Sequence, residues 1–352
     1  MPSAVKGALL TLTLAACDAG GQGYTPENPP PHVVQVLVTT DVDAEGSRVR
    51  SPLGDDDVVA ATTTSIGIVF DRYLDPRSTI RQSYCLHSDT APVATLSECV
   101  QAISTVPTYD PVTRTVTLYL DEALAPDTSY SLVIFAAARN LDFGFRAFDD
   151  VALEETITFS LSTLAENPTG LDQLESPADL DEGIVSCDDA RTLFAGCTTC
   201  HSDVELIDGA FVANAPMGLS FEPNGLPLAI DRVAHQTALA DQGAEAATRP
   251  ARFGAGMPVI QRSNPGNSYA IYKVLARARY YGDTMTEGEL ERLQSWIVGA
   301  PMPSHEVKIV ENPDDPDGPP IEASAAITQG ALRRISNWIA AGASCEGPTA
   351  AP

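Results

Sequence analysis

The segment Thr115-Val-Thr-Leu-Tyr-Leu120 decides the fold class of the first half of the chain, because aliphatic residues alternate in it with Thr and Tyr. Successive side chains of an extended chain point to opposite sides, so the alternation places the three aliphatic residues on one face. The segment Ile66-Gly-Ile-Val-Phe70 also has an apolar residue at every second position. A period of two predicts half-buried antiparallel strands.

Further short segments rich in β-branched residues lie around these two, separated by clusters of Pro, Asp and Gly. Such spacing is typical of a β-sandwich. The sequence therefore predicts an all-β sandwich over residues 32–165. The expected strands cover residues 33–38, 65–70, 113–120, 129–135 and 156–161.

Three segments of this region resemble the bacterial Ig-like domains of exported proteins: Ile66-Gly-Ile-Val-Phe-Asp-Arg-Tyr-Leu-Asp-Pro76, Val116-Thr-Leu-Tyr-Leu120 and Leu124-Ala-Pro-Asp-Thr-Ser-Tyr-Ser-Leu-Val-Ile134. The resemblance covers residues 32–165 and implies a spacer or interaction module without chemistry of its own. His87 also lies here, but no second ligand stands at a metal-binding spacing from it. We expect His87 to be a surface or core histidine.

The chain begins with a short positive segment ending at Lys6, an apolar run over residues 7–14 and small residues before Cys17. These are the parts of an export signal, and the apolar run is too short to span a bilayer. Leu14-Ala-Ala-Cys17 resembles the lipobox of bacterial lipoproteins. The resemblance implies a lipoprotein signal peptide over residues 1–16 and a diacylglycerol on the Cys17 sulfur. The alternative is an ordinary secretory signal with a chance cysteine.

A lipid on Cys17 would anchor the protein to a membrane of the cell envelope, on its periplasmic or cell-surface side. Residues 17–31 are rich in Gly, Pro, Asn and Asp and are expected to form a flexible tether. A hydrophobic content of 44% excludes a disordered chain. The net charge of −26 repels phosphate backbones, so we expect no nucleic-acid partner. Such acidity serves solvation or the docking of a basic partner.

Residues 166–185 are rich in Pro, Asn and acidic residues and are expected to form a linker. Beyond them the apolar residues recur with a helical period. Thr286 and Glu289 have the spacing of a capping box at a helix start. Ser186 is expected to cap a first helix that carries Cys197 to His201 at its end. Three more helices are expected over residues 268–279, 286–298 and 328–341, with Gly342 past the last of them and a tail over residues 348–352.

The chain contains seven cysteines, an odd number that needs an explanation in an exported protein. Lipidation accounts for Cys17, and a Cys-x-x-Cys-His motif takes two more. The four that remain form two disulfides most simply as Cys85 with Cys99 and Cys187 with Cys345, although spacing alone does not prove either pair.

The motif Cys197-Thr-Thr-Cys200-His201 is the attachment pattern of c-type haem. The two thiols add to the haem vinyl groups, and the histidine binds the iron. A thioredoxin-like dithiol would require a surrounding βαβ unit, which the sequence lacks. Half a zinc site would require two further ligands, which Cys187 and Cys345 could supply only by giving up their disulfide.

Residues 183–347 resemble the c-type cytochrome domains of exported bacterial proteins. The matching segments include Asn264-Pro-Gly-Asn-Ser-Tyr-Ala-Ile-Tyr-Lys-Val-Leu275, Gly299-Ala-Pro-Met-Pro303 and a closing helix through Trp338-Ile-Ala-Ala-Gly-Ala343. The resemblance implies an all-α cytochrome c-like domain over residues 186–347 with one covalent haem c. It also implies that Met302 is the sixth iron ligand.

Other residues compete with Met302 for this role. Met257 is followed by the same proline but precedes two of the expected helices, so we expect it to be structural. His235 and His305 stay open as sixth ligands. Residues 311–320, which are acidic and rich in Pro, are expected to form a solvated loop on the way to the last helix.

These expectations predict a membrane-anchored monohaem c-type cytochrome that passes single electrons to a redox partner protein, a basic one given the charge. The alternative is an exported surface interaction or assembly protein whose Ig-like module carries the function and whose haem is structural or sensory. We expect no enzyme activity. A peroxidase would need an open axial site and nearby acid–base groups, and two axial ligands leave no open site.

Overall fold

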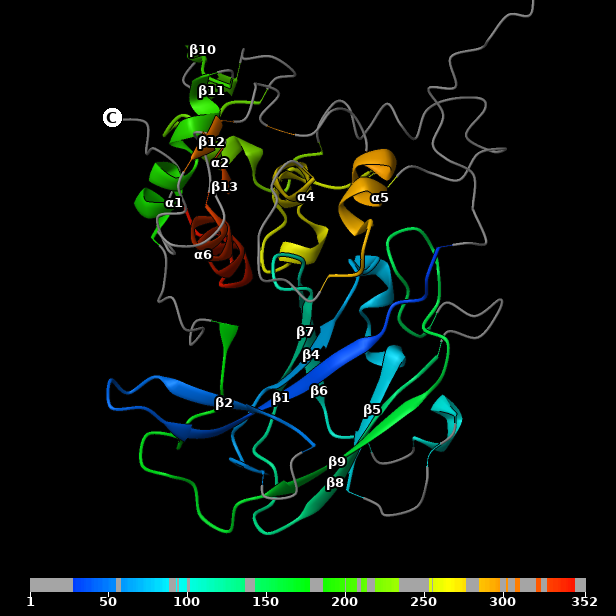
Figure 1. The fold of residues 1–352 in the computed structure, drawn as a ribbon. Helices are drawn as coiled ribbons and strands as arrows, with labels where there is room; N and C mark the ends of the chain where they lie inside the picture. The colour runs from blue at the N-terminus through cyan, green and yellow to red at the C-terminus, as the bar shows by residue number, and fades with distance from the viewer. Residues whose placement is uncertain are drawn as a thin grey trace, which may run out of the picture.

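The structure, a computed structural model, has a β-rich N-terminal part and a C-terminal part of short helices and hairpins (Figure 1). It describes residues 28–54, 58–88, 93, 95–99, 102–136, 143–177, 186–199, 201–207, 210–213, 219–233, 253–254, 256–276, 285–297, 302, 308–310, 321–323 and 328–345. Within these ranges, no helix is long and apolar enough to cross a membrane.

The first sheet of the N-terminal part has five strands in the order β2-β1-β4-β7-β6, all paired antiparallel. The two central strands β4 and β7 are buried along their whole length, although the sequence predicted half-buried strands. The bounds are β1 Val33–Val42, β2 Arg48–Pro52, β4 Ile66–Phe70, β6 Thr105–Asp110 and β7 Thr115–Leu120.

The second sheet has four strands in the order β3-β9-β8-β5, of which only β3 and β9 pair in parallel. Apolar residues of both sheets, such as Ile68 and Leu132, belong to one buried core. The β-rich N-terminal part is therefore confirmed. The bounds are β3 Val59–Ala60, β5 Tyr84–His87, β8 Ser129–Ile134 and β9 Ile157–Thr163, with single-turn helices at Pro76–Ser78, Arg81–Ser83 and Leu96–Glu98.

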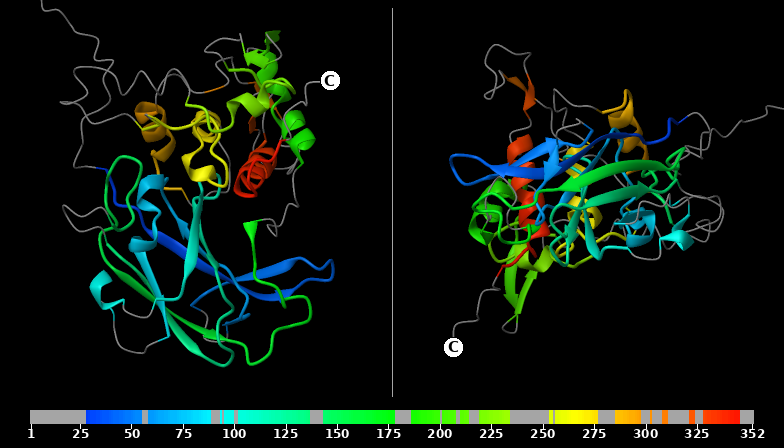
Figure 2. Two further views of the ribbon diagram at one scale, coloured as in Figure 1. Left: turned by 180° about the vertical axis from the view of Figure 1, so that it is seen from behind. Right: turned by 90° about the horizontal axis from the view of Figure 1, so that it is seen from below.

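The expected all-α C-terminal domain is wrong, because the described residues there form short helices and two antiparallel hairpins (Figures 1 and 2). The longest helix, α6, has 12 residues. The helices are α1 Cys187–Leu193, α2 Leu226–Ala229, α4 Tyr269–Leu275, α5 Glu289–Trp296 and α6 Gln329–Ala340, with turns at Ala195–Thr199 and Pro265–Asn267. The hairpins pair β10 Val204–Ile207 with β11 Ala210–Ala213, and β12 Lys308–Val310 with β13 Ile321–Ala323.

The sequence contains a physical reason for the first hairpin. Asp208-Gly209 stands between two short apolar runs, and this dipeptide is among the strongest signals for a tight hairpin turn. The prediction of helices throughout this region rested on the helical period of its apolar residues and did not include this turn. The second hairpin pairs the segments that flank residues 311–320, which themselves lie outside the described residues.

Helix α5 begins three residues later than its expected cap. Gly288, with φ of 74°, is its N-cap, and Thr286 instead donates its hydroxyl to Asp71, 2.7 Å away. The Glu289 carboxylate turns inward and accepts hydrogen bonds from the Arg72 guanidinium at 2.8 Å and the Tyr73 amide at 2.9 Å. The predicted capping box is therefore wrong, since Glu289 binds the sandwich instead of the helix start.

The two parts of the chain share one hydrophobic core. The Phe148 ring of the N-terminal part contacts Phe253 and Trp296 of the C-terminal part, with ring centroids 5.5 and 6.4 Å apart. Beside them the Arg72 side chain is fully buried and pairs with Asp149 and Glu289, both also fully buried. Apolar and ionic contacts thus join the C-terminal part to the sandwich.

Two disulfides join the pairs that the sequence favoured. Cys85–Cys99 closes a short loop on the outside of the second sheet. Cys187–Cys345, with Cα atoms 5.1 Å apart, ties the start of α1 to the segment after α6. These two helices pack against each other.

Candidate functional site

Helix α1 is followed directly by a short helical turn, Ala195–Thr199, in which the Cys-x-x-Cys-His motif begins. The Cys197 amide donates to the Phe194 carbonyl at 2.8 Å, and the His201 amide donates to the Cys197 carbonyl at 3.0 Å. This i to i+4 bond brings the first cysteine and the histidine to the same side of one turn. Cys200 lies outside the described residues, as does Cys17.

The His201 ring is oriented by the chain segment that begins at Leu219. Its Nδ1 lies 3.3 Å from the Leu219 carbonyl oxygen, and the His201 carbonyl accepts a hydrogen bond from the Phe221 amide at 2.9 Å. A carbonyl oxygen can only accept, so Nδ1 is the donor of this contact and Nε2 is the ring nitrogen left for another partner. Histidines that bind metals are held in this way, with the other ring nitrogen donating to a carbonyl or carboxylate.

Aromatic rings cover the inner side of His201. The Phe221 ring meets the imidazole edge to face at 5.8 Å and stacks on the Phe194 ring at 4.8 Å. Phe194 and Phe221 are buried, whereas His201 is half-buried. The imidazole is therefore fixed on one side by packing and on the other reaches the surface.

Two buried donors on the neighbouring helices have no hydrogen-bond partner among the described residues. They are Arg191 Nε on α1 and Trp338 Nε1 on α6. A buried N–H without an acceptor costs about 1–3 kcal/mol, so such atoms suit an acceptor supplied by a bound group. Haem carries two propionate carboxylates, and these donors have the chemistry to bind them. The donor chemistry of these two atoms is compatible with a haem, while covalent attachment rests on the Cys-x-x-Cys-His motif.

Met302 lies beside α4. Its amide donates to the Lys273 carbonyl at 2.8 Å, and its side chain is half-buried. Burial lowers the pKa of the Lys273 ammonium to about 8, and its Nζ lies 5.6 Å from the centre of the Tyr269 ring. The neighbours of Met302 are therefore different from those of His201, and the sixth-ligand assignment stays a prediction.

The competing residues are placed as follows. Met257 is buried in the shared core, and its amide donates to the Gly254 carbonyl at 3.1 Å. His235 and His305 lie outside the described residues. His87 is a core histidine in β5, 2% exposed, with Nε2 unpaired among the described atoms.

A zinc site gains no support from the described part of the chain. Cys187 and Cys345, the two further ligands that it would need, are bonded to each other. No group of three or more His, Cys, Asp or Glu side chains is placed to hold a metal ion within the ranges described.

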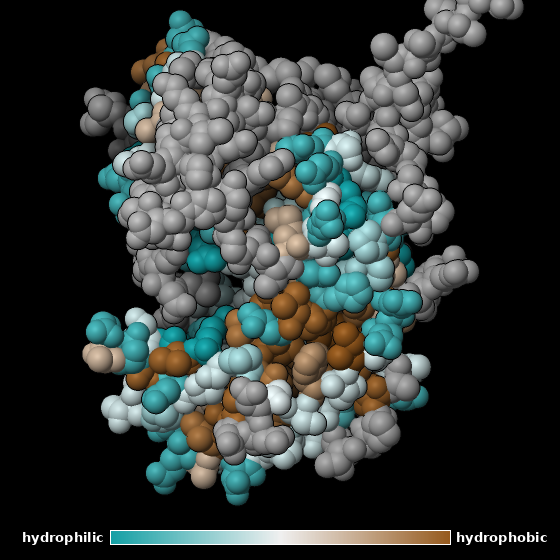
Figure 3. All heavy atoms as spheres, viewed as in Figure 1, coloured by the Kyte–Doolittle hydropathy of each residue, from teal (hydrophilic) through white to brown (hydrophobic). Residues whose placement is uncertain are grey.

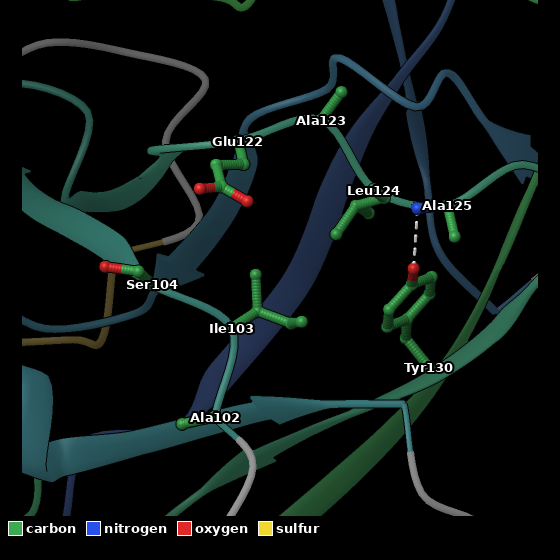
Figure 4. Close-up of a pocket in the computed structure, with 8 residues that line it drawn as sticks. All are labelled: Ala102, Ile103, Ser104, Glu122, Ala123, Leu124, Ala125 and Tyr130. Atoms are coloured by element: carbon green, nitrogen blue, oxygen red, sulfur yellow. Dashed lines mark hydrogen bonds between the residues drawn. The ribbon is translucent and has the colours of Figure 1, made fainter.

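A separate hollow of about 390 Å³ lies in the sandwich, between residues 102–104 and 122–125 (Figure 4). The Tyr130 ring closes one side, and its hydroxyl oxygen accepts a hydrogen bond from the Ala125 amide at 2.8 Å. Glu122 and Ser104 are the only polar side chains in its lining apart from this hydroxyl. The Ser104 hydroxyl at its rim donates a hydrogen bond to the Asp121 carboxylate.

No protein-family model matches the chain, and no curated protein is significantly similar to it. The likenesses to Ig-like and c-type cytochrome domains therefore rest on the short motifs alone.

Sequence reasoning missed several contributors to the site. The Leu219 carbonyl is a main-chain group 18 positions after His201, so no residue type could have marked it. Nothing in the sequence marked Arg191, and Trp338 entered only through the closing helix of the cytochrome resemblance, without a role as a donor. The two donors belong to one candidate site only because α1 packs against α6 in the folded chain.

Proposed function

We propose that this protein is an exported electron carrier with one covalently attached haem c. Cys197 and Cys200 provide the two thioether bonds, and His201 is the axial ligand through Nε2. The observation that carries the proposal is the approach of His201 Nδ1 to the Leu219 carbonyl, because it orients the ring and leaves Nε2 as the nitrogen that would bind the iron. The fold of the C-terminal part carries none of the argument.

The side chains around the motif have distinct roles in this proposal. The Leu219 carbonyl holds the imidazole in one tautomer, and Phe194 and Phe221 exclude water from its inner side. Arg191 Nε and Trp338 Nε1, which are buried without a partner among the described residues, would donate to the haem propionates. The haem supplies an iron that exchanges one electron without proton chemistry.

We further propose that Met302 supplies the sixth ligand and Cys17 the lipid anchor. A thioether opposite an imidazole stabilises ferrous iron, and two axial ligands deny the iron to small molecules. This favours electron transfer over a peroxidase or a gas sensor. The place of action is then the surface of a cell-envelope membrane, with a redox protein as the partner.

The test is export of the full chain from a host with cytochrome c maturation, followed by intact mass and the reduced pyridine-haemochrome spectrum. The wild type should carry one covalent haem, and the Cys197→Ser, Cys200→Ser variant should carry none. The Cys85→Ser, Cys99→Ser variant is the matched control, because it removes two cysteines of the sandwich and should keep the haem. A wild type without haem would overturn the proposal and leave a dithiol protein.

A further inference from the structure

The β10–β11 hairpin begins at Val204, three residues after His201. Its register pairs Glu205 with Val212 and Ile207 with Ala210. Paired side chains lie on the same face of a hairpin, so these four residues form one face. All four are exposed.

The opposite face of the hairpin packs inward. Val204, Phe211 and Ala213 on that face are half-buried, and only Leu206 near the turn is exposed, at 60%. The hairpin thus has an inner face that packs and an outer face that meets solvent. We call Glu205, Ile207, Ala210 and Val212 the hairpin patch.

The hairpin patch concentrates exposed apolar side chains. Seven large hydrophobic residues are strongly exposed in the described part of the chain, and the hairpin holds three of them. Ile207 and Val212 of the patch are 45 and 39% exposed, and Leu206, on the other face beside the turn, is 60% exposed. Single exposed aliphatic residues are ordinary on protein surfaces, but three on one short hairpin mark a contact site. Apolar and hydrophilic residues lie side by side where the hairpin reaches the surface (Figure 3, upper left).

We propose that the hairpin patch is the docking surface for the redox partner, a protein with a small apolar area rimmed by Lys and Arg around its own redox group. This inference rests on the proposed function. Glu205 in the patch and Asp203 at its base are acidic, and the whole chain carries −26. Opposite charge speeds the encounter, and the aliphatic side chains supply the water-free contact.

The same charge argues against a second copy of this chain as the occupant, since two acidic surfaces repel. The patch is also small. Electron-transfer complexes are typically small and short-lived, with less than about 1,200 Å² buried, and a hairpin of this size fits that class.

The hairpin also lies away from the end of the molecule where the N-terminal segment enters. Asn28 donates to the Asp149 carboxylate and the Pro29 carbonyl accepts from Arg72, which fixes that segment near the start of α5. The views of Figures 1 and 2 place α5 and the start of β1 on one side and β10–β11 on the other. The hairpin patch and the N-terminal segment therefore lie at different ends of the described molecule.

The experiment uses the full exported chain, purified in mild detergent and shown by pyridine haemochrome to hold its haem. Stopped-flow mixing measures electron exchange, in whichever direction is downhill, with mitochondrial cytochrome c as a basic protein probe and with hexaammineruthenium as a small probe. The Ile207→Ser, Val212→Ser variant should lose about fivefold or more in rate with the protein probe and little with ruthenium. The Val34→Ser, Val106→Ser variant, altered at exposed residues of the sandwich, should match the wild type.

The charge contribution is tested by Glu205→Gln, which should flatten the decrease in rate with added salt. Equal rates for the hairpin variant and the wild type would overturn the docking surface while leaving the haem assignment intact. A changed haem spectrum or potential in the hairpin variant would overturn it too, because the hairpin would then line the haem. A dimer in light scattering that the variant abolishes would assign the patch to a second copy. A wild type without haem would refute the proposed function, and this inference with it.

Discussion

Arg72 is the residue on which the junction between the two parts depends most. It pairs with Asp149 at 2.7 Å and with Glu289 at 2.8 Å, and all three side chains are fully buried. Burial raises the pKa of the Glu289 carboxyl against the opposing attraction of the Arg72 guanidinium. The charges are tolerated only because each is held against an opposite charge.

We therefore expect Arg72→Met to lower the free energy of unfolding by about 3–5 kcal/mol, because buried Asp149 loses its counter-ion and buried Glu289 keeps only Arg292, at 3.1 Å. Urea titration followed by circular dichroism measures the loss. Arg77→Met is the matched control, since Arg77 pairs with Asp75 but its side chain is 83% exposed, and it should cost less than about 1 kcal/mol. Equal losses for the two variants would show that the buried pairing contributes little.

The sixth ligand is tested at the same scale. Met302→Leu removes the thioether and keeps the apolar volume, so the ferric protein should lose the sulfur-to-iron charge-transfer band. Met257→Leu, a change at a buried methionine of the core, should keep the band. A band that survives in Met302→Leu and disappears in Met257→Leu would exchange the two assignments. Absence of the band in the wild type would favour His235 or His305 as the sixth ligand.

At the scale of elements, the predictable features were those whose partners are local. Ser186 caps α1 by accepting from the Asp189 amide, as the sequence predicted. The helix predicted over residues 328–341 is α6, and Thr328 caps it by accepting from the Ala331 amide. The start of α5 was not predictable, because the partner of Glu289 lies 217 positions away. Tertiary pairing there outweighs the local capping preference.

The features of the candidate site also divide into local ones, which the sequence shows, and distant ones, which only the fold brings together. The Cys-x-x-Cys-His spacing is local and was evident in the sequence, and so was the helix that leads into it. The Leu219 carbonyl and the donors of Arg191 and Trp338 come together only through folding. The β10–β11 hairpin was not predicted, although the local dipeptide Asp208-Gly209 signals a tight turn, because the whole region was expected to be helical.

The disulfide between α1 and α6 offers a prediction at this scale. Removing it as Cys187→Ser, Cys345→Ser should cost about 5 kcal/mol, against about 3 kcal/mol for Cys85→Ser, Cys99→Ser, because the unfolded chain gains more freedom from the longer loop. The sequence separations are 158 and 14 residues. Urea unfolding of both variants measures the difference. A larger loss from the shorter loop would mean that native contacts, and not loop length, dominate.

At the scale of the whole molecule, the sandwich and the C-terminal part meet closely at Gly266. A Cβ there would lie 2.8 Å from the Tyr109 ring and 3.0 Å from the Tyr109 carbonyl, closer than real contacts allow. The Tyr272 hydroxyl donates to the Gly266 carbonyl at 2.7 Å, and Ser336 of α6 donates to Asp110 at 2.5 Å. Main chain and side chains of both parts therefore interlock at the end of β6.

Gly266→Ala should accordingly destabilise the protein by about 1–3 kcal/mol through overpacking. Gly330→Ala on α6 is the matched control, because a Cβ there meets nothing within 4 Å and alanine is the better helix former. That control should be neutral or stabilise by up to about 1 kcal/mol. Thermal unfolding of both variants distinguishes the effects, and a harmless Gly266→Ala would show that the two parts can separate slightly at no cost.

Because of the shared core, we expect each part of the chain to depend on the other for its fold. A cut between residues 165 and 186 would leave Phe148 and Arg72 on one fragment without the rings and the carboxylate of the other. Neither fragment would then be an autonomous folding unit, and limited proteolysis should yield no stable half. Exchanging this sandwich for another of the same architecture would break the junction, so the two parts must be inherited, expressed and engineered together.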